Sequence, residues 1–202
     1  MRLTALGLAL CASLSARAGA LYVAPAAGSY ELPPISQVHA HELVDADGAR
    51  VRFPQLAKGQ VALVAFIYRG CHEAQGCPAS LALLRELDRK LAADPTRASR
   101  VRLASVSFDP ANDTPERMRE LREMMAPMTE WGFLSAADPE ALAPLLADFG
   151  QDATPLENGA FRHVLKIFLV DDQLRVRNVY SAGLLDPELV LADVDTVSGA
   201  ER

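Results

Sequence analysis

The sequence predicts one α/β domain with a mixed central sheet and flanking helices, and three observations lead to it. Apolar runs of strand length alternate with helical patterns of roughly ten to fifteen residues, which is typical of βαβ units with parallel strands. Two short strand patterns near the carboxyl end lie around Asp171-Asp172-Gln173, which predicts an antiparallel pair at the sheet edge. Finally, the 202 residues are 50% apolar and 23% charged, as in an ordinary globular domain.

Residues 1–20 have the pattern of a secretory signal peptide. Arg2 supplies a positive start, 3–14 is mostly apolar, and Ala18-Gly19-Ala20 is one of two stretches suited to cleavage. The apolar run of about twelve residues is shorter than the roughly twenty needed to span a bilayer, so we expect no stable membrane span. Lipidation of Cys11 is disfavoured because the bulky Leu10 precedes it. The predicted location is outside the cytoplasm, which in a bacterium means the periplasm.

The next segments lead into the sheet. Residues 21–40, with three prolines and no helical or strand period, are predicted to form an extended linker. From His41 to Phe53, apolar pairs flank a turn with Gly48, which predicts a β-hairpin. The continuous apolar run Val61–Tyr68 is typical of a central strand covered on both faces.

The remaining elements continue the alternation. We expect a helix from Pro78, a strand at Val101–Phe108, a helix starting around Asp113-Thr114-Pro115, a strand at Trp131–Leu134, a helix at Pro139–Phe149, strands at Ile167–Val170 and Val176–Tyr180, and a last helix at Asp186–Val194. This order is typical of a thioredoxin-like fold over residues 41–197, followed by a tail at 198–202. In such a sheet, sites form beyond the carboxyl ends of parallel strands, here after Tyr68.

Cysteines lie in that turn. Without residues 1–20 only Cys71 and Cys77 remain, and Cys77 precedes Pro78 at the start of a predicted helix, where the helix dipole favours the thiolate. Two thiolates and an imidazole suit copper, because soft sulfur holds Cu(I) and nitrogen also accommodates Cu(II). Two alternatives remain open: a thiol-disulfide oxidoreductase, in which one thiol attacks a partner and the other resolves, and a structural disulfide.

The sequence offers four histidines as a third ligand. His39 and His41 are expected to be solvated, although together they could add a weak metal site. His72 adjoins Cys71, which makes simultaneous ligation awkward. His163 precedes the predicted strand at 167–170 and would return beside the cysteine turn if that strand neighbours the central one.

Several motifs together resemble the Sco (SenC) family of copper chaperones. These are FIYRGC with a second cysteine before proline, SVSFDPANDTPE, WGFLS, and His163 before KIFLVDD, within a span of roughly Glu31 to Val194. The resemblance implies a thioredoxin-like fold and the copper ligands Cys71, Cys77 and His163. It further implies delivery of copper to a metalloprotein such as the binuclear copper site of a cytochrome c oxidase subunit.

The chain departs from the family pattern in two places. Five residues separate its cysteines where the family usually has three, so the loop is larger. Val164 follows the histidine in place of a small hydroxyl residue, and Asp171-Asp172-Gln173 replaces the family's Asp-Pro-Asp-Gly. Because most members of the family also keep a membrane anchor, the acceptor of this chain could differ from the oxidase.

The charge of the chain argues against two classes of partner. The net charge of −6 and the absence of a basic cluster argue against nucleic acid and anionic membranes, while oligomeric state is left open. Asp109 and Asp113 could orient a ligand, with Asp113 more simply a helix cap. Trp131 is expected in the core. Three acidic residues near the end are expected in a solvated tail: Asp193, Asp195 and Glu201.

Overall fold

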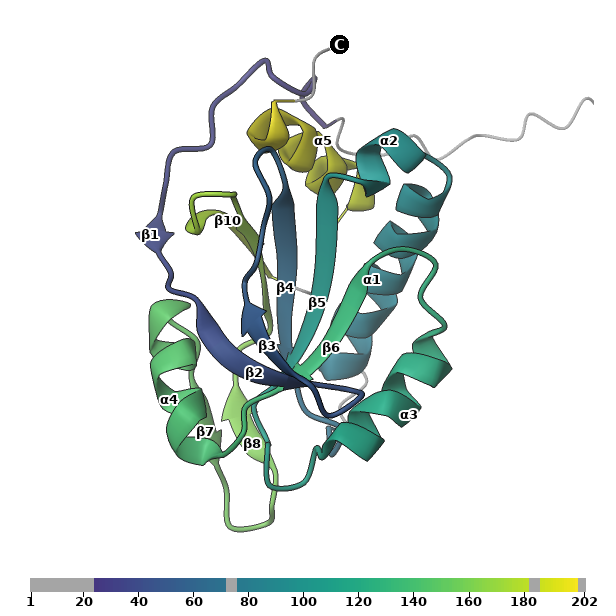
Figure 1. The fold of residues 1–202 in the computed structure, drawn as a ribbon. Coiled ribbons are helices and arrows are strands. Elements are labelled where there is room, and N and C mark those ends of the chain that lie inside the picture. The colour runs from purple at the N-terminus through teal and green to yellow at the C-terminus, as the bar shows by residue number, and fades with distance from the viewer. Residues whose placement is uncertain (1–23, 72–75, 182–185, 200–202) are drawn as a thin grey trace, which may run out of the picture.

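A computed structural model describes residues 24–71, 76–181 and 186–199. Its helices are α1 (Cys77–Ala92), α2 (Pro95–Ala98), α3 (Pro115–Met125), α4 (Pro139–Asp148) and α5 (Pro187–Ser198). Its strands are β1 (Ser36–Gln37), β2 (His41–Asp45), β3 (Arg50–Phe53), β4 (Val61–Ile67), β5 (Val101–Ser107), β6 (Trp131–Ser135), β7 (Ala153–Pro155), β8 (Phe161–His163), β9 (Lys166–Val170) and β10 (Arg175–Ser181). The predicted α/β class, with a mixed sheet and an amino-terminal hairpin, is confirmed (Figure 1).

The main sheet has the strand order β1-β10-β9-β4-β5-β6-β2-β3. Strands β4, β5 and β6 are parallel, whereas β9 pairs with β4 in the antiparallel direction. Every residue of β4 is buried, as its unbroken apolar sequence predicts for a strand covered on both faces. The pairing of β9 with β4 fulfils the condition under which His163 was expected to return to the cysteine turn.

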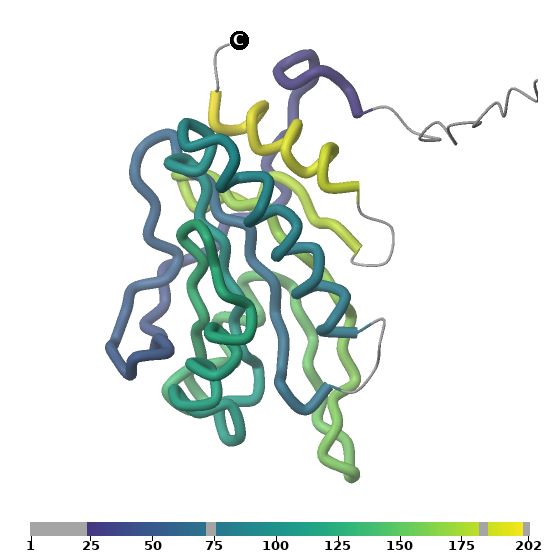
Figure 2. Tube along the Cα trace, turned by 90° about the vertical axis from the view of Figure 1, so that its right-hand side faces the viewer, coloured from purple at the N-terminus to yellow at the C-terminus, as the bar shows by residue number. Residues whose placement is uncertain are grey.

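Helices cover the central strands from one side. Both α1 and α5 contact β4, and α1 also contacts β5. Figure 2 shows these two helices on the opposite side of the sheet from the hairpin β2–β3. On α1, Leu84, Leu87 and Leu91 are fully buried, because their three- and four-residue spacing places them on one helical face. Trp131 is buried in the core, as predicted.

The last helix corrects one expectation. Asp193 does not belong to a solvated tail: it is 2% exposed, and its carboxylate accepts hydrogen bonds from the hydroxyls of Tyr30 and Tyr180 and from the amide of Asn178. Asp195 pairs with Arg97 at 2.8 Å. Both residues were placed in a tail because the helix was expected to end at Val194, whereas it continues for four more residues. Its last turn has few apolar residues, so the sequence pattern does not show it. Glu201 lies outside the described residues.

The amino-terminal segment is attached to the sheet. Strand β1 pairs with β10, Val38 is 1% exposed, and the backbone N–H of Gly28 donates to the Thr196 hydroxyl. The sequence pattern predicted only an extended chain here, because a two-residue strand is too short to show a period. No helix within the described ranges is long and apolar enough to cross a membrane.

The connection between α4 and β9 contains a hairpin that the sequence analysis did not predict. Strands β7 and β8 form a separate two-stranded sheet, with Ala153 opposite His163 and Pro155 opposite Phe161. His163 is therefore held in a strand, whereas a loop was expected. This small sheet is not hydrogen bonded as a ladder to the main sheet.

Candidate metal centre

Cys71 lies in the turn that follows β4. Its backbone N–H donates to the carbonyl of Tyr68 over 3.3 Å, and its side chain is buried. Gly70 allows the ring of Tyr68 to lie close to the turn, since a Cβ at that position would lie 3.3 Å from two of its ring carbons, tighter than nine in ten real contacts. The central strand thus ends by turning the first sulfur inward.

Cys77 is the first residue of α1. Gly76 occupies the N-cap position and Pro78 lies in the first turn, where its fixed φ suits a helix and its missing N–H leaves no donor unpaired. Cys77 is 2% exposed. The sequence predicts a helix from Pro78, and the helix begins one residue earlier. The second sulfur is therefore fixed by a helix that packs on the sheet.

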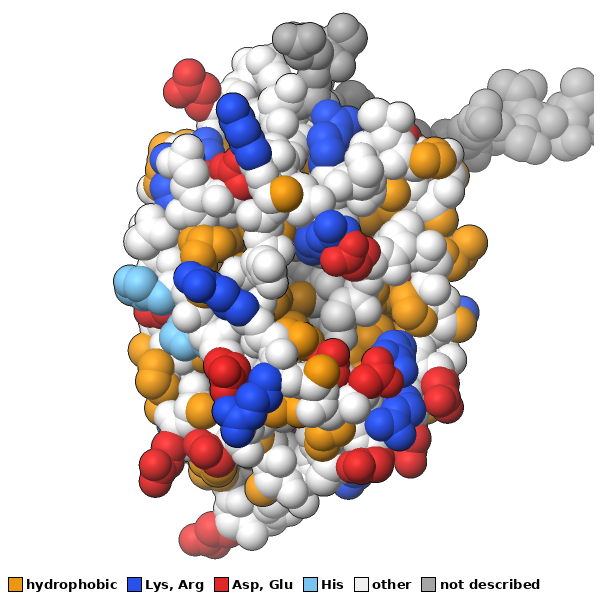
Figure 3. All heavy atoms as spheres, in the orientation of Figure 1, with side chains coloured by type: hydrophobic (Ala, Val, Ile, Leu, Met, Phe, Trp, Pro, Cys, Tyr) orange, Lys and Arg blue, Asp and Glu red, His pale blue; other side chains and the backbone are white. Residues whose placement is uncertain are grey.

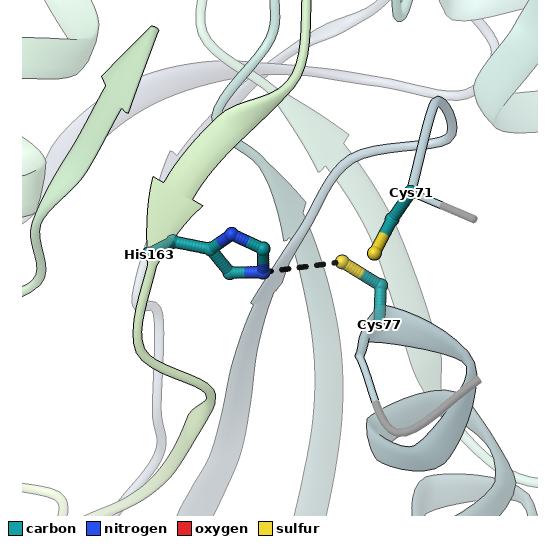
Figure 4. Close-up of side chains that lie close together, drawn as sticks. All are labelled: Cys71, Cys77 and His163. Carbon is teal, nitrogen blue, oxygen red and sulfur yellow. Dashed lines mark hydrogen bonds between the residues drawn. The ribbon is translucent and has the colours of Figure 1, made fainter. Parts of the chain in front are cut away.

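His163 closes the group from β8. Its Nε2 lies 3.8 Å from Sγ of Cys77 (Figure 4). The ligand atoms of Cys71, Cys77 and His163 all lie within 4.8 Å of one another, and among the described residues this is the group of three whose donor atoms are that compact. Both cysteines are free thiols. Two cysteines that flank one loop thus meet a histidine that lies 86 residues from Cys77 in the sequence.

The imidazole of His163 is oriented by its surroundings. Its Nδ1 lies 3.1 Å from the carbonyl oxygen of Phe161, so Nδ1–H donates there and the lone pair of Nε2 faces the sulfurs. The ring also packs against Phe108 at 5.1 Å and, edge-on, against Tyr68 at 5.6 Å between centroids. These contacts hold the ring in a ligating orientation, and the sequence analysis identified neither aromatic residue.

Burial changes the expected chemistry of Cys77. Desolvation, with a smaller contribution from the neighbouring Cys71, raises the pKa of Cys77 to about 12 from an ordinary value of 9.0. The prediction that the start of the helix would favour the thiolate is therefore wrong for the metal-free protein. The helix begins in the right place, but the cost of burying a charge outweighs the dipole. A metal ion that binds here must displace the proton.

A small cleft opens beside the sulfurs. It has a volume of about 160 Å³, and its walls bring apolar side chains of α1 and α3 next to both cysteines. The principal lining residues are Tyr68, Cys71, Cys77, Leu81, Leu121 and Met124. Met124 is exposed at the rim. The cleft opens beside both sulfurs, which are otherwise buried.

A second hollow of about 550 Å³ lies on the other side of the sheet. Small residues of β4, β5 and β6, namely Ala62, Ala104 and Gly132, leave this space beneath the chain that follows β3 (Figure 3). Its lining contains neither cysteine nor histidine. Although it is larger than the cleft beside the sulfurs, it is remote from the candidate ligands.

The other candidate residues lie apart from the three ligands. His39 and His41 both face Asp148, and His72 lies outside the described residues. Asp113 does not cap α3, whose N-cap is Thr114. It is buried instead, and it accepts hydrogen bonds from the Ser107 hydroxyl at 2.6 Å and the Arg69 backbone N–H at 3.0 Å.

By accepting a hydrogen bond from the backbone N–H of Arg69, Asp113 supports the turn that leads to Cys71. Burial raises the pKa of Asp113, although its two hydrogen bonds act to lower it. Asp109 bonds to the side-chain amide of Asn112 at 3.0 Å. Neither carboxylate joins the compact group formed by the two sulfurs and the imidazole.

Comparison with known proteins identifies the family. The SCO1/SenC family model matches residues 32–199. A comparison with curated protein sequences gave no match. Similar solved structures include a SCO1/SenC family lipoprotein from Bacillus anthracis str. Ames, which is 22% identical with a TM-score of 0.73 over 84% of this chain and 99% of the other.

Two further solved structures are similar to this chain. BsSco, a member of the Sco family of cytochrome c oxidase assembly proteins in which a disulfide switch was identified, is 24% identical, with a TM-score of 0.72 over 85% of this chain and 100% of its own. Bradyrhizobium japonicum ScoI with copper bound is 26% identical, with a TM-score of 0.64 over 80% of this chain and 99% of its own. The chain therefore belongs to the SCO1/SenC family and has the thioredoxin-like fold of its members.

Proposed function

We propose that this protein binds copper through Cys71, Cys77 and His163 and delivers it to a metalloprotein outside the cytoplasm. The observation that carries the proposal is the convergence of two free sulfurs and one oriented imidazole nitrogen within 4.8 Å of one another. Thiolates are preferred ligands of Cu(I), and the imidazole adds affinity for Cu(II). The copper-bound structure of Bradyrhizobium japonicum ScoI, with the same fold, supports this choice of metal.

Delivery proceeds by ligand exchange. Copper binding expels the thiol proton of Cys77, and the cleft beside the sulfurs admits ligands of the acceptor, which replace those of this chain one at a time. We propose the binuclear copper site of a cytochrome c oxidase subunit as the acceptor. Support comes from BsSco, a member of the Sco family of cytochrome c oxidase assembly proteins. Export would depend on residues 1–20 acting as a signal.

Titration with Cu(I) under anaerobic, reducing conditions tests the binding step. In competition with a Cu(I) chelator, we expect one equivalent to bind, and Cys71→Ser or Cys77→Ser to abolish tight binding. His163→Ala is expected to weaken Cu(II) binding strongly. Glu42→Ala is the control, because Glu42 is exposed, pairs with Arg50 and lies outside this group. Uptake that persists after Cys71→Ser would exclude the proposed site.

The same two sulfurs support a second candidate function. They are unpaired yet close, so one thiolate can attack a disulfide of a partner and the other can resolve the mixed disulfide; the partner takes up the two electrons and leaves with two thiols, while Cys71 and Cys77 become a disulfide. The reduction potential of the pair discriminates this function from a structural bond. A potential below about −300 mV would mark a structural bond that resists reduction by ordinary cellular thiols.

A further inference from the structure

Two histidines and a carboxylate converge on the surface, away from the cysteines. Nε2 of His41 lies 2.8 Å from one oxygen of Asp148, and Nδ1 of His39 lies 3.1 Å and 3.2 Å from the two oxygens. The backbone N–H of His39 donates to the same carboxylate at 2.9 Å. The histidine side chains visible on the face in Figure 3 gather at its left margin, beside the region where Figure 1 shows α4.

The backbone explains this convergence. His41 is the first residue of β2 and His39 lies two residues before it, and both rings point toward Asp148. Asp148 is the last residue of α4, and its carboxylate contacts both rings. His41 and Asp148 are largely buried, with side chains 16% and 19% exposed, whereas His39 is 74% exposed. Two of the three groups are thus held in place and the third is free to adjust.

We infer that His39, His41 and Asp148 form a second metal site, for a divalent ion of borderline softness such as Zn(II) or Cu(II). Two imidazole nitrogens and one carboxylate oxygen are ligands typical of such ions, and no thiolate is present to select Cu(I). The hydrogen bonds from His41 and His39 outweigh the effect of partial burial and lower the pKa of Asp148, so the carboxylate stays ionised at neutral pH.

Metal binding requires a rearrangement, because the donor atoms of His39, His41 and Asp148 do not all lie within 4.8 Å of one another. Zn–N and Zn–O bonds are about 2.0–2.2 Å, so the ion takes the place of the ring protons that now face Asp148, and these protons move to the opposite ring nitrogens. His39 supplies the needed movement, because its side chain is mostly exposed. The remaining coordination positions are filled by water. An ion held this way joins the start of β2 to the end of α4.

This site is independent of the proposed copper centre in both position and chemistry. None of its three residues belongs to the Cys71–Cys77–His163 group. The test therefore begins from the Cys71→Ser/Cys77→Ser variant, which lacks the soft ligands, and uses Zn(II) as the probe in isothermal titration calorimetry. We expect one equivalent of Zn(II) to bind. His41→Ala and Asp148→Ala in this background should each weaken binding by at least about ten- to a hundredfold.

Two further variants separate ligation from folding. His39→Ala changes a side chain that is 74% exposed and should weaken binding without shifting the thermal midpoint. Glu42→Ala is the matched control: Glu42 lies next to His41, is exposed, and pairs with Arg50. It should leave Zn(II) binding unchanged. With Cu(II) in the same background, electron paramagnetic resonance should show nitrogen coupling that His39→Ala reduces.

Two outcomes would overturn the inference. One is a double serine variant that binds no Zn(II), and the other is one that binds it equally well after His39→Ala and His41→Ala. Neither outcome affects the Cu(I) titration of the unmodified cysteines, so failure here is distinguishable from failure of the copper proposal.

Discussion

The high pKa of Cys77 leads to a quantitative prediction about thiol reactivity. Burial is the largest cause of the shift from 9.0 to about 12, and only the thiolate attacks an alkylating reagent. At pH 8, a thiol with a pKa of 9 is ionised in about one molecule in ten, and a thiol with a pKa of 12 in about one in ten thousand. Cys77 in the folded, metal-free protein should therefore react about a thousandfold more slowly than in the unfolded chain. This corresponds to about 4 kcal/mol.

The assay is the pH dependence of iodoacetamide labelling in a Cys11→Ala/Cys71→Ser variant, which has one thiol. Removing Cys71 takes away the smaller contributions to the shift and leaves burial, so the pKa should stay above 9. The labelling rate should rise tenfold per pH unit without levelling off near pH 9. The same variant in urea is the control and should level off there. A folded-state plateau at or below pH 9 would refute the argument, because slow access alone lowers the rate without moving the plateau.

Three other perturbations have definite expected outcomes. Asp88→Ala removes a buried carboxylate that accepts three hydrogen bonds from residues 128–129, so the free energy of unfolding in urea should fall by about 3 kcal/mol; a loss under about 0.5 kcal/mol would contradict this. Asp193→Ala leaves two tyrosine hydroxyls and an amide without their acceptor, and a similar loss is expected by the same measurement. Phe108→Ala removes the ring packed 5.1 Å from His163 and should weaken Cu(II) binding about tenfold in a competition titration, whereas unchanged affinity would show that the ring does not position the imidazole.

Long periodic segments of the fold are predictable from the sequence. The apolar run of β4 and the leucine spacing of α1 locate both elements, because each pattern extends over several residues and one face dominates it. The β7–β8 hairpin escapes prediction since each of its strands has three residues, too few to show alternation. His163 lies in a strand because it pairs with Ala153. This pairing arises only in the folded chain, so no local sequence pattern shows it.

The candidate sites divide in the same way. The two cysteines are identifiable from their positions after a central strand and before a helix, whereas selecting His163 depended on family resemblance. Nothing local in the sequence relates Asp148 to His41, which is 107 residues away. The protonation state of Cys77 was mispredicted because a helix start is visible in a sequence, but the burial that opposes it arises only when the chain is packed.

The three proposed copper ligands come from two parts of the fold that are not joined by a strand ladder. The sulfurs are fixed to the end of β4 and the start of α1, whereas the imidazole is on the two-stranded ribbon β7–β8. Displacement of that ribbon would leave an ion at the proposed site with two protein ligands, and it would also separate Phe161 from the core rings of Tyr68 and Phe108. Linear coordination by two sulfurs suits the monovalent ion, and the added nitrogen suits the divalent one. At the proposed site, the position of the ribbon and the oxidation state of the ion would therefore be linked.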